Sequence, residues 1–412
     1  MAGDSLSVTE TGLQAVDTAM QAVSDNLANA QTTGFNAESV DFGTLLGEFV
    51  GGSPLGGGVT VTGITRDFSQ GAIVQSNSPT DLAIQGNGFF VFKDSSGNTG
   101  FSRNGGFSIG NNGDLLSFNG AQVMGYSVNS SGQSSGVLGT IVIPQGVLAP
   151  TATTQAAITG NFDAGSPTIA GPINPADPTT YSTSVSVQAF DSLGNSHVLT
   201  FYFQNSGPSG ATPPTEQWNW TATLDGSTTG LANNSGSITF DSAGALVSGG
   251  IPPSPLTATL SSAAPMSVAL NFGALTQFNG ASAATGTADG NAVGNPVGVQ
   301  VSNNGLISES YSNGQTVDVG QVAIATFQAN QGLQLTNSGV YEQTQASGPA
   351  TIATAGAGSA GTIEASALES SNVDTTSQLV QLVVLQRNFQ SNAKALQTED
   401  NILGTLMQLQ TT

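Results

Sequence analysis

Apolar residues near the start of the chain recur at spacings of three and four, which is the pattern of an amphipathic helix. A repeat of this kind averages 3.5 residues and is typical of a coiled-coil seam. We expect a helix from about residue 6 to residue 30, closed by Gly34 in the left-handed conformation. The predicted seam positions are Leu13, Val16, Met20, Val23, Leu27 and Ala30.

A matching pattern lies at the other end of the chain, where four large apolar residues repeat every seven positions. A second helix is expected to begin near residues 372–374, whose residue types suit an N-cap. Neither helix carries enough apolar surface to be stable alone. We therefore expect the two ends to pair, and off-seam residues such as Val380, Val384 and Ile402 to seek neighbouring copies. The predicted seam positions are Leu379, Leu382, Phe389, Ala393, Leu396, Leu403 and Met407.

The chain between the helices alternates short apolar runs with Asn-Gly turns, a pattern that predicts β-strands and hairpins. The amino-acid composition changes near residue 145. A Pro-, Ala- and Thr-rich stretch at 144–178 is expected to be a boundary or loop. A second β region follows, in which Trp218 and Trp220 alternate with polar residues as in a half-buried strand. The predicted fold is mixed and mainly β, with nested, discontinuous domains. These are a terminal helical domain (1–34 plus 372–412), a connector (35–70), a first β domain (71–145 plus 297–371) and an inserted outer β domain (146–296).

The amino-acid composition argues against several classes of function. The 412 residues include 26 acidic and only five Lys or Arg residues, for a formal charge of −21, so nucleic-acid binding is close to excluded. An anionic membrane would repel the same surface. The absence of cysteine removes disulfides and thiolate chemistry. We expect neither a secretory signal peptide nor a transmembrane helix.

No residue pattern points to catalysis. His197, the sole histidine, follows a predicted turn and is interpreted as a turn-flanking polar residue rather than a base. Gly86 and Gly88 lack the third glycine and the helix of a dinucleotide loop. Acidic residues are spread through turns without a pair suited to glycoside chemistry, and no spacing matches a calcium loop. We therefore predict no catalytic residue, no cofactor and no metal.

Four segments, in order along the chain, resemble signatures of the axial proteins of the bacterial flagellum, the rod and hook family. They are residues 26–36 (NLANAQTTGFN), 82–90 (LAIQGNGFF) with 102–107 (SRNGGF), 368–374 (LESSNVD) and 385–394 (LQRNFQSNAK). The motif positions carried over are Asn26, Asn29, Gly34, Phe35, Gly86, Gly88, Phe89, Phe90, Asn372, Val373, Asp374, Gln386 and Arg387.

The inserted β domain, with residues 189–197 (AFDSLGNSH), resembles that of the hook branch of this family. The resemblance implies a structural subunit, not an enzyme, that self-assembles into a flexible helical tube and transmits torque as a universal joint. Implied partners are other copies of the chain, the distal rod, the hook cap, the hook-filament junction and the flagellar type III export apparatus. The implied location is extracellular, without a cleaved signal. The alternatives are a distal rod or junction protein of the same family and, further off, a secreted β-rich adhesin.

Overall fold

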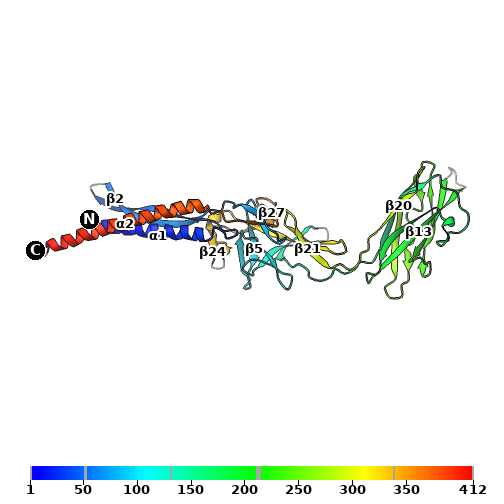
Figure 1. The fold of residues 1–412 in the computed structure, drawn as a ribbon, viewed down its shortest axis with the longest axis horizontal. Helices are drawn as coiled ribbons and strands as arrows, with labels where there is room; N and C mark the ends of the chain where they lie inside the picture. Colours follow the sequence, from blue (N-terminus) through cyan, green and yellow to red (C-terminus); the bar gives the residue numbers. More distant parts are fainter. Residues whose placement is uncertain (1, 51–52, 130–131, 210–214, 337–338, 411–412) are drawn as a thin grey trace. The chain divides into compact units, whose positions relative to one another are not determined.

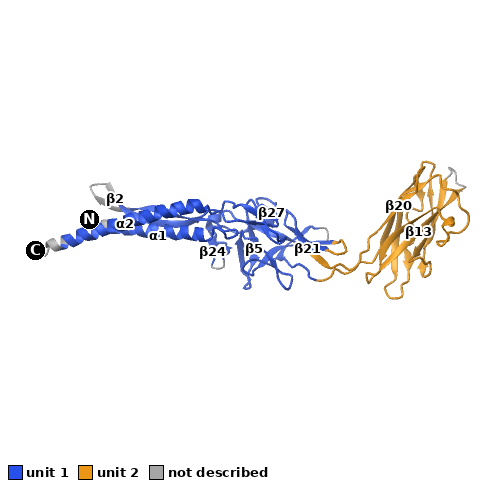
Figure 2. Ribbon diagram, viewed as in Figure 1, with its two compact units in different colours: residues 1–145, 298–310, 316–412 blue, residues 146–297, 311–315 orange. Residues whose placement is uncertain are grey.

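The computed structural model describes residues 2–50, 53–129, 132–209, 215–336 and 339–410. The chain divides into two compact units, coloured separately in Figure 2. Unit 1 comprises Met1–Gln145, Gly298–Ser310 and Thr316–Thr412. Unit 2 comprises Gly146–Val297 and the short turn Tyr311–Gln315.

The two long helices of unit 1 lie side by side (Figure 1). They are α1 (Ala2–Ala28) and α2 (Thr375–Gln410). The start of α2 confirms the expected cap, because Asp374 Oδ1 accepts the N–H groups of Thr376 at 2.9 Å and Ser377 at 3.3 Å. α1 ends two residues earlier than expected, so Ala30 lies in the turn that follows. Gly34 has φ +68°, the left-handed conformation that was predicted.

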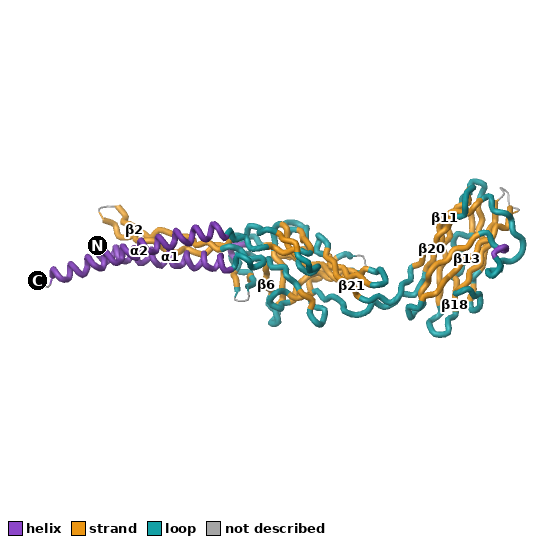
Figure 3. The backbone as a smooth tube through the Cα atoms, viewed as in Figure 1, coloured by secondary structure: helices purple, strands orange, loops and turns teal. Residues whose placement is uncertain are grey.

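The segment expected as a connector forms a long antiparallel hairpin of β1 (Glu38–Val50) and β2 (Ser53–Arg66), seen beside the helices in Figure 3. Apolar pairs such as Phe42 opposite Val61 hold it together despite the many glycines of β2. Those glycines hid the strand pattern, because glycine weakens a strand and supplies no apolar signal. Residues 51–52 of the glycine-rich stretch lie outside the described residues. The hairpin packs on α1, where Thr11 Oγ1 accepts the Val59 N–H at 3.4 Å.

The rest of unit 1 is a β domain. Its described strands form one twelve-stranded sheet and two small two-stranded sheets, which pair β4 with β27 and β3 with β28. The core lies on both sides of β5, whose successive side chains join two different buried clusters. The strands of the large sheet are β5 (Phe89–Lys93), β6 (Thr99–Ser102), β7 (Ser108–Ile109), β8 (Leu115–Leu116), β9 (Gln122–Val128), β10 (Ser134–Thr140), β21 (Pro296–Val301), β22 (Leu306–Tyr311), β23 (Thr316–Thr326), β24 (Gln334–Leu335), β25 (Tyr341–Glu342) and β26 (Thr351–Thr354). The small sheets contain β3 (Ile73–Gln75), β4 (Leu82–Gln85), β27 (Thr362–Ala365) and β28 (Ala367–Glu369), and a short 3₁₀ turn spans Asn330–Gly332.

Unit 2 contains two five-stranded sheets around one buried cluster of aromatic and aliphatic residues. One sheet has the order β12-β13-β14-β16-β17, and the other β15-β18-β19-β11-β20, with β11 parallel to β19. The strands are β11 (Gln155–Asp163), β12 (Thr183–Phe190), β13 (Ser196–Ser209), β14 (Thr215–Leu224), β15 (Leu231–Ala232), β16 (Ser235–Phe240), β17 (Leu246–Ser248), β18 (Leu256–Ala258), β19 (Met266–Phe278) and β20 (Ala283–Ala288), with a 3₁₀ turn at Pro178–Thr180.

Two expectations about this unit have different outcomes. The alternating strand at Trp218 and Trp220 is confirmed, because both rings are buried in the core and Trp218 stacks on Phe162 at 4.7 Å. The loop expected at 144–178 was wrong in part, because β11 lies inside it. The buried side of β11 carries both small and large residues, so the alternation of large apolar with polar residues is weak in the sequence.

His197 joins two turns of unit 2. Its Nδ1 lies 2.7 Å from Asp225 Oδ2, and its Nε2 lies 3.6 Å from Asp191 Oδ2. Hydrogen bonds from Asn195 and Leu193 hold the pKa of Asp191 at about 2. Burial lowers the pKa of His197, but the two carboxylates outweigh burial and raise it above 6.5 overall. Residues 146–297 contain no Lys or Arg, so His197 is the sole basic side chain there.

We expect the stability of unit 2 to fall as pH rises through the raised pKa of His197. Its protonated form is favoured in the folded state, so the contribution is complete below about pH 6.5 and lost above the folded-state pKa. A partly exposed pair of this kind contributes up to about 1 kcal/mol, or about 2–4 °C in Tm. Both tryptophans lie in this unit, so Trp fluorescence during thermal unfolding reports on it alone. The control is His197→Gln, whose Tm should not change between pH 6 and pH 8.5; an equal slope in both chains would contradict the assignment.

Candidate assembly interface and its junction

The seam of α2 faces α1 through a regular heptad series. The described members of that series are at least half-buried, except Phe389, and Leu385 is the most buried. The buried apolar positions of α1 are mostly small: Ala15, Ala19 and Ala22 join Val23. Small side chains let the helix backbones approach closely. The seam positions of α2 are Leu382, Leu385, Phe389, Asn392, Leu396, Glu399 and Leu403.

Two of the seven seam positions of α2, Asn392 and Glu399, were missed from the sequence because they are polar. Asn392 lies over Gly12, where an added Cβ would be 3.1 Å from its Nδ2. Glu399 accepts a hydrogen bond from Thr9 at 3.4 Å. Polar residues at seam positions set the register of a coiled coil at some cost in stability. An apolar periodicity search skips such positions.

The predicted positions on α1 are brought together, with Leu13, Val16, Met20 and Leu27 half-buried and Val23 buried. Three predicted α2 positions, Leu379, Phe389 and Met407, are instead exposed within the single chain, together with four further apolar residues. Five of these seven residues, on the side of the helix turned away from the seam, form an exposed apolar face, which we call the free face of α2. Its members, with exposed fractions, are Leu379 (49%), Val380 (61%), Val383 (48%), Val384 (49%) and Ile402 (53%).

The helices and hairpin join the β domain of unit 1 through three crossing segments: residues 29–37, 67–72 and 370–374. Two asparagine amides hold the ends of these segments, Asn26 between α1 and β1 and Asn372 between the segments themselves. Asn26 pairs with both backbone groups of Glu38 at 2.7 Å. Asn372 accepts the Ala37 N–H at 2.8 Å and donates to the Asp67 carbonyl at 2.7 Å.

A buried ion pair lies at the centre of the junction. Arg103 Nη1 donates to Glu369 Oε2 at 3.1 Å, and the two residues are 5% and 2% exposed. The other oxygen of Glu369 accepts the Gly71 N–H, and its backbone carbonyl accepts the Gly34 N–H, both at 2.8 Å. Glu369 therefore binds all three crossing segments at once.

A second contact lies beside the ion pair. The Tyr341 hydroxyl donates to Asn36 Oδ1 at 3.1 Å, and its ring packs edge-on against Phe68 and Phe89. Burial raises the pKa of Tyr341 to about 12, so it stays a donor. Arg66, at the end of the hairpin, pairs with Glu38 and lies 6.0 Å from the Tyr341 ring.

The remaining motif positions have local roles. Asn29 accepts from Thr32 at 3.1 Å and helps close α1. Gly86 and Gly88 both have positive φ, and a Cβ on Gly88 would lie 2.2 Å from Ile324. Phe89 and Phe90 are fully buried on opposite sides of β5, whereas Phe35 and Val373 are half-buried. Gln386 and Arg387 are exposed, and among the described residues Arg387 forms no ion pair.

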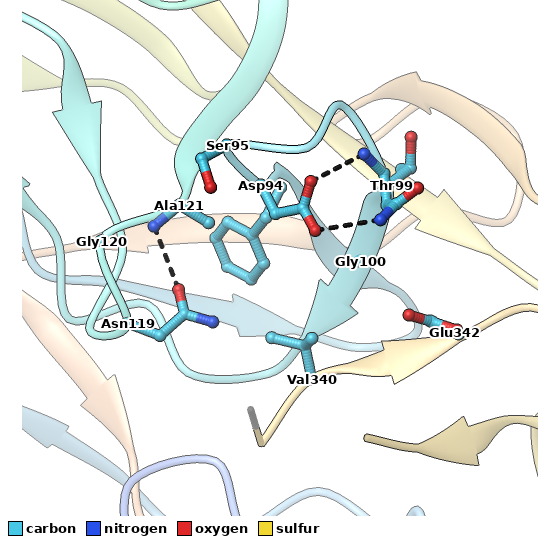
Figure 4. A pocket seen from close by; sticks show the side chains of 11 residues that line it. Asp94, Ser95, Thr99, Gly100, Asn119, Gly120, Ala121, Val340 and Glu342 are labelled. Atoms are coloured by element: carbon cyan, nitrogen blue, oxygen red, sulfur yellow. Dashed lines mark hydrogen bonds between the residues drawn. The ribbon is translucent and has the colours of Figure 1, made fainter. Parts of the chain in front are cut away.

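The cavities of unit 1 include an open one of about 490 Å³ lined by residues 74–77 and 368–370. Another, of about 220 Å³, lies beside the β5–β6 loop (Figure 4). There the Asp94 carboxylate is turned toward its own loop and accepts the N–H groups of Asn98 and Ser96 at 2.7 and 2.9 Å. The bond from Asn98 is the main cause of a lowered pKa for Asp94. Within the described part of the chain, no cluster of three His, Asp or Glu residues suits a metal ion, and no helix is long and apolar enough to cross a membrane.

The matches to known protein families follow the order of the regions described above. Four family models match in order: the flagella basal body rod protein (6–36), the flagellar hook protein FlgE/F/G D1 domain (83–161), the flagellar basal body protein FlaE D2 domain (159–291) and the flagellar basal body rod FlgEFG protein C-terminal model (364–409). Together they define a flagellar axial protein of the rod and hook class.

Full-length relatives specify the branch. The chain is 34% identical to the flagellar hook protein FlgE of Escherichia coli K12 over 97% of this chain and 98% of that one. It is also 34% identical to FlgE of Salmonella typhimurium LT2, over 98% and 100%. The crystal structure of Helicobacter pylori FlgE2 shares the fold, with TM-score 0.53 and 15% identity over 72% of this chain and 100% of that one. The chain belongs to the flagellar hook protein FlgE family.

We expect Gly34→Ala to destabilise unit 1 more than the substitution of a positive-φ glycine that has open space around it. Its Cβ would lie 2.6 Å from the Asn104 backbone N, inside the junction. The matched control is Gly120→Ala, at φ +79° with open space around it. The left-handed conformation alone costs about 1–2 kcal/mol, so we expect about that loss for Gly120→Ala and at least about 2 kcal/mol more for Gly34→Ala. Calorimetric unfolding measures both; equal losses would show that the close approach does not matter.

Proposed function

We propose that this chain builds the flagellar hook by polymerising through the free face of α2. The family is structural rather than enzymatic, and its members form the hook, an extracellular part of the flagellum. The observation that carries the proposal is the free face itself. Five large apolar residues on one helix remain at least 48% exposed after α1 has covered the other side.

Burial of these residues supplies the free energy of assembly. A half-exposed Val or Leu gains roughly 1 kcal/mol when a neighbour covers it. Several such residues per copy drive polymerisation. The α1–α2 pair then forms the inner layer of a tube, and the two β regions lie outward of it. Such a tube bends while transmitting torque.

Other partners follow from membership of the family. A hook subunit meets the distal rod at one end and the hook cap and hook-filament junction at the other. It reaches the outside through the flagellar type III export apparatus, for which no cleaved signal is needed.

The double substitution Val380→Ser with Val384→Ser tests the assembly proposal. Loss of about 2 kcal/mol per contact raises the critical concentration for polymerisation about 30-fold. Sedimentation of purified chain measures it, and circular dichroism checks that the monomer keeps its helices. The matched control is Val247→Ser, equally exposed on β17 of unit 2. An unchanged critical concentration in the double variant would refute the free face as the interface.

A further inference from the structure

Glu369 and Arg103 connect segments that are far apart in the sequence. Arg103 follows β6 and donates to the carbonyl of Gly86 at 2.8 Å and, weakly, to that of Ile84 at 3.4 Å. Its guanidinium also lies 5.6 Å from the centre of the Phe89 ring. Arg103 is therefore anchored in the body of the β domain. Glu369, at the end of β28, leads through residues 370–374 to α2.

The backbone segments around Glu369 are tightly packed. A Cβ on Gly71 would lie 2.0 Å from the Ser370 carbonyl oxygen. One on Gly34 would lie 2.7 Å from the Arg103 carbonyl carbon. The crossing segments therefore touch each other and the Arg103 loop directly, so a change in their direction must break the bonds to Glu369.

A buried ion pair is not an efficient source of stability, because an apolar pair of similar volume often does as well. The ion pair instead fixes the relative orientation of the two side chains, because the donors of a guanidinium lie in one rigid plane. Here the Glu369 carboxylate accepts from Arg103 of the β domain and from Gly71, and the Glu369 backbone carbonyl accepts from Gly34. These bonds are satisfied in one arrangement of the helix pair relative to the β domain of unit 1.

We propose that Arg103 and Glu369 are positioning residues that fix the direction in which the terminal helices leave the first β domain, and that this direction sets the helical pitch and curvature of the polymer. The inference rests on the proposed function, because direction matters to the polymer only if the helices join neighbouring copies. Stability of the monomer is a separate property.

The test replaces the pair without leaving a buried charge, by Arg103→Met with Glu369→Gln. The amide that replaces the carboxylate still carries an oxygen that can accept the Gly71 N–H. The matched control is Lys93→Met with Glu342→Gln, which removes the same two charges from exposed positions on the same domain. If the double variant does not fold, Arg103→Lys takes its place, since it keeps the charge and loses the planar donors.

The chain contains no cysteine, so Ser95→Cys and Gln390→Cys place spin labels only on the β5–β6 loop and on α2, both exposed. In tubes where labelled copies are diluted with unlabelled ones, pulsed spin resonance measures the distance between the labels. We expect one narrow distribution for the original pair and for the control. The pair variant should at least double the width, and electron microscopy should show a changed pitch.

Two results would overturn the proposal: a broad distribution with the original pair, or a width and pitch that the pair variant leaves unchanged. Failure of the proposed function has a different signature, because tubes would then form as readily from the Val380→Ser, Val384→Ser chain. The two ideas can therefore fail separately.

Discussion

One buried carboxylate holds together three stretches of chain that lie far apart in the sequence. Glu369 accepts from Arg103 and Gly71 through its side chain and from Gly34 through its carbonyl. Because it is only 2% exposed, water cannot replace any of these partners. A buried charge that loses its partner costs about 3–5 kcal/mol. The α1–α2 pair, the hairpin and the β domain all depend on this point for their attachment.

The helix pair beyond the junction has two faces with different purposes. The seam toward α1 combines large apolar residues with Asn392 and Glu399. Polar residues in a seam specify the register of the two helices at some cost in the stability of their pairing. The free face of α2 is purely aliphatic near its start, at Leu379–Val380 and Val383–Val384. A helix arranged in this way is aligned by contacts within its own chain and is buried further by contacts with other copies. Unit 2 has its own buried core.

How much could be predicted from the sequence varied with the range of the interaction. Local signals succeeded: the Asp374 cap, the left-handed Gly34 and the alternation at Trp218–Trp220 all depend on neighbouring residues. The heptad of Leu382, Leu396 and Leu403 was also visible, because apolar periodicity marks it. Asn392 and Glu399 were not, since a polar seam residue looks like a surface residue.

Long-range pairings left no such signal. The β1–β2 hairpin was hidden by glycines, and β11 by small residues on its buried side. The Arg103–Glu369 pair joins residues 266 positions apart, and nothing near either residue marks its partner. The family resemblance identified Asn26 and Asn372 as motif positions but did not indicate which groups their side chains bind. The structure shows that both use side-chain amides to pair with backbone groups, Asn26 with Glu38 at the start of β1 and Asn372 with Ala37 and Asp67 of two crossing segments.

The most direct test of the whole account is a cryo-electron microscopy reconstruction of tubes assembled from this chain, at a resolution that shows side chains. The account predicts that Val380 and Val384 are covered by a neighbouring copy and that the bond between Arg103 and Glu369 is intact in every subunit. A free face that points into open solvent, or a junction in which that bond is broken, would contradict it.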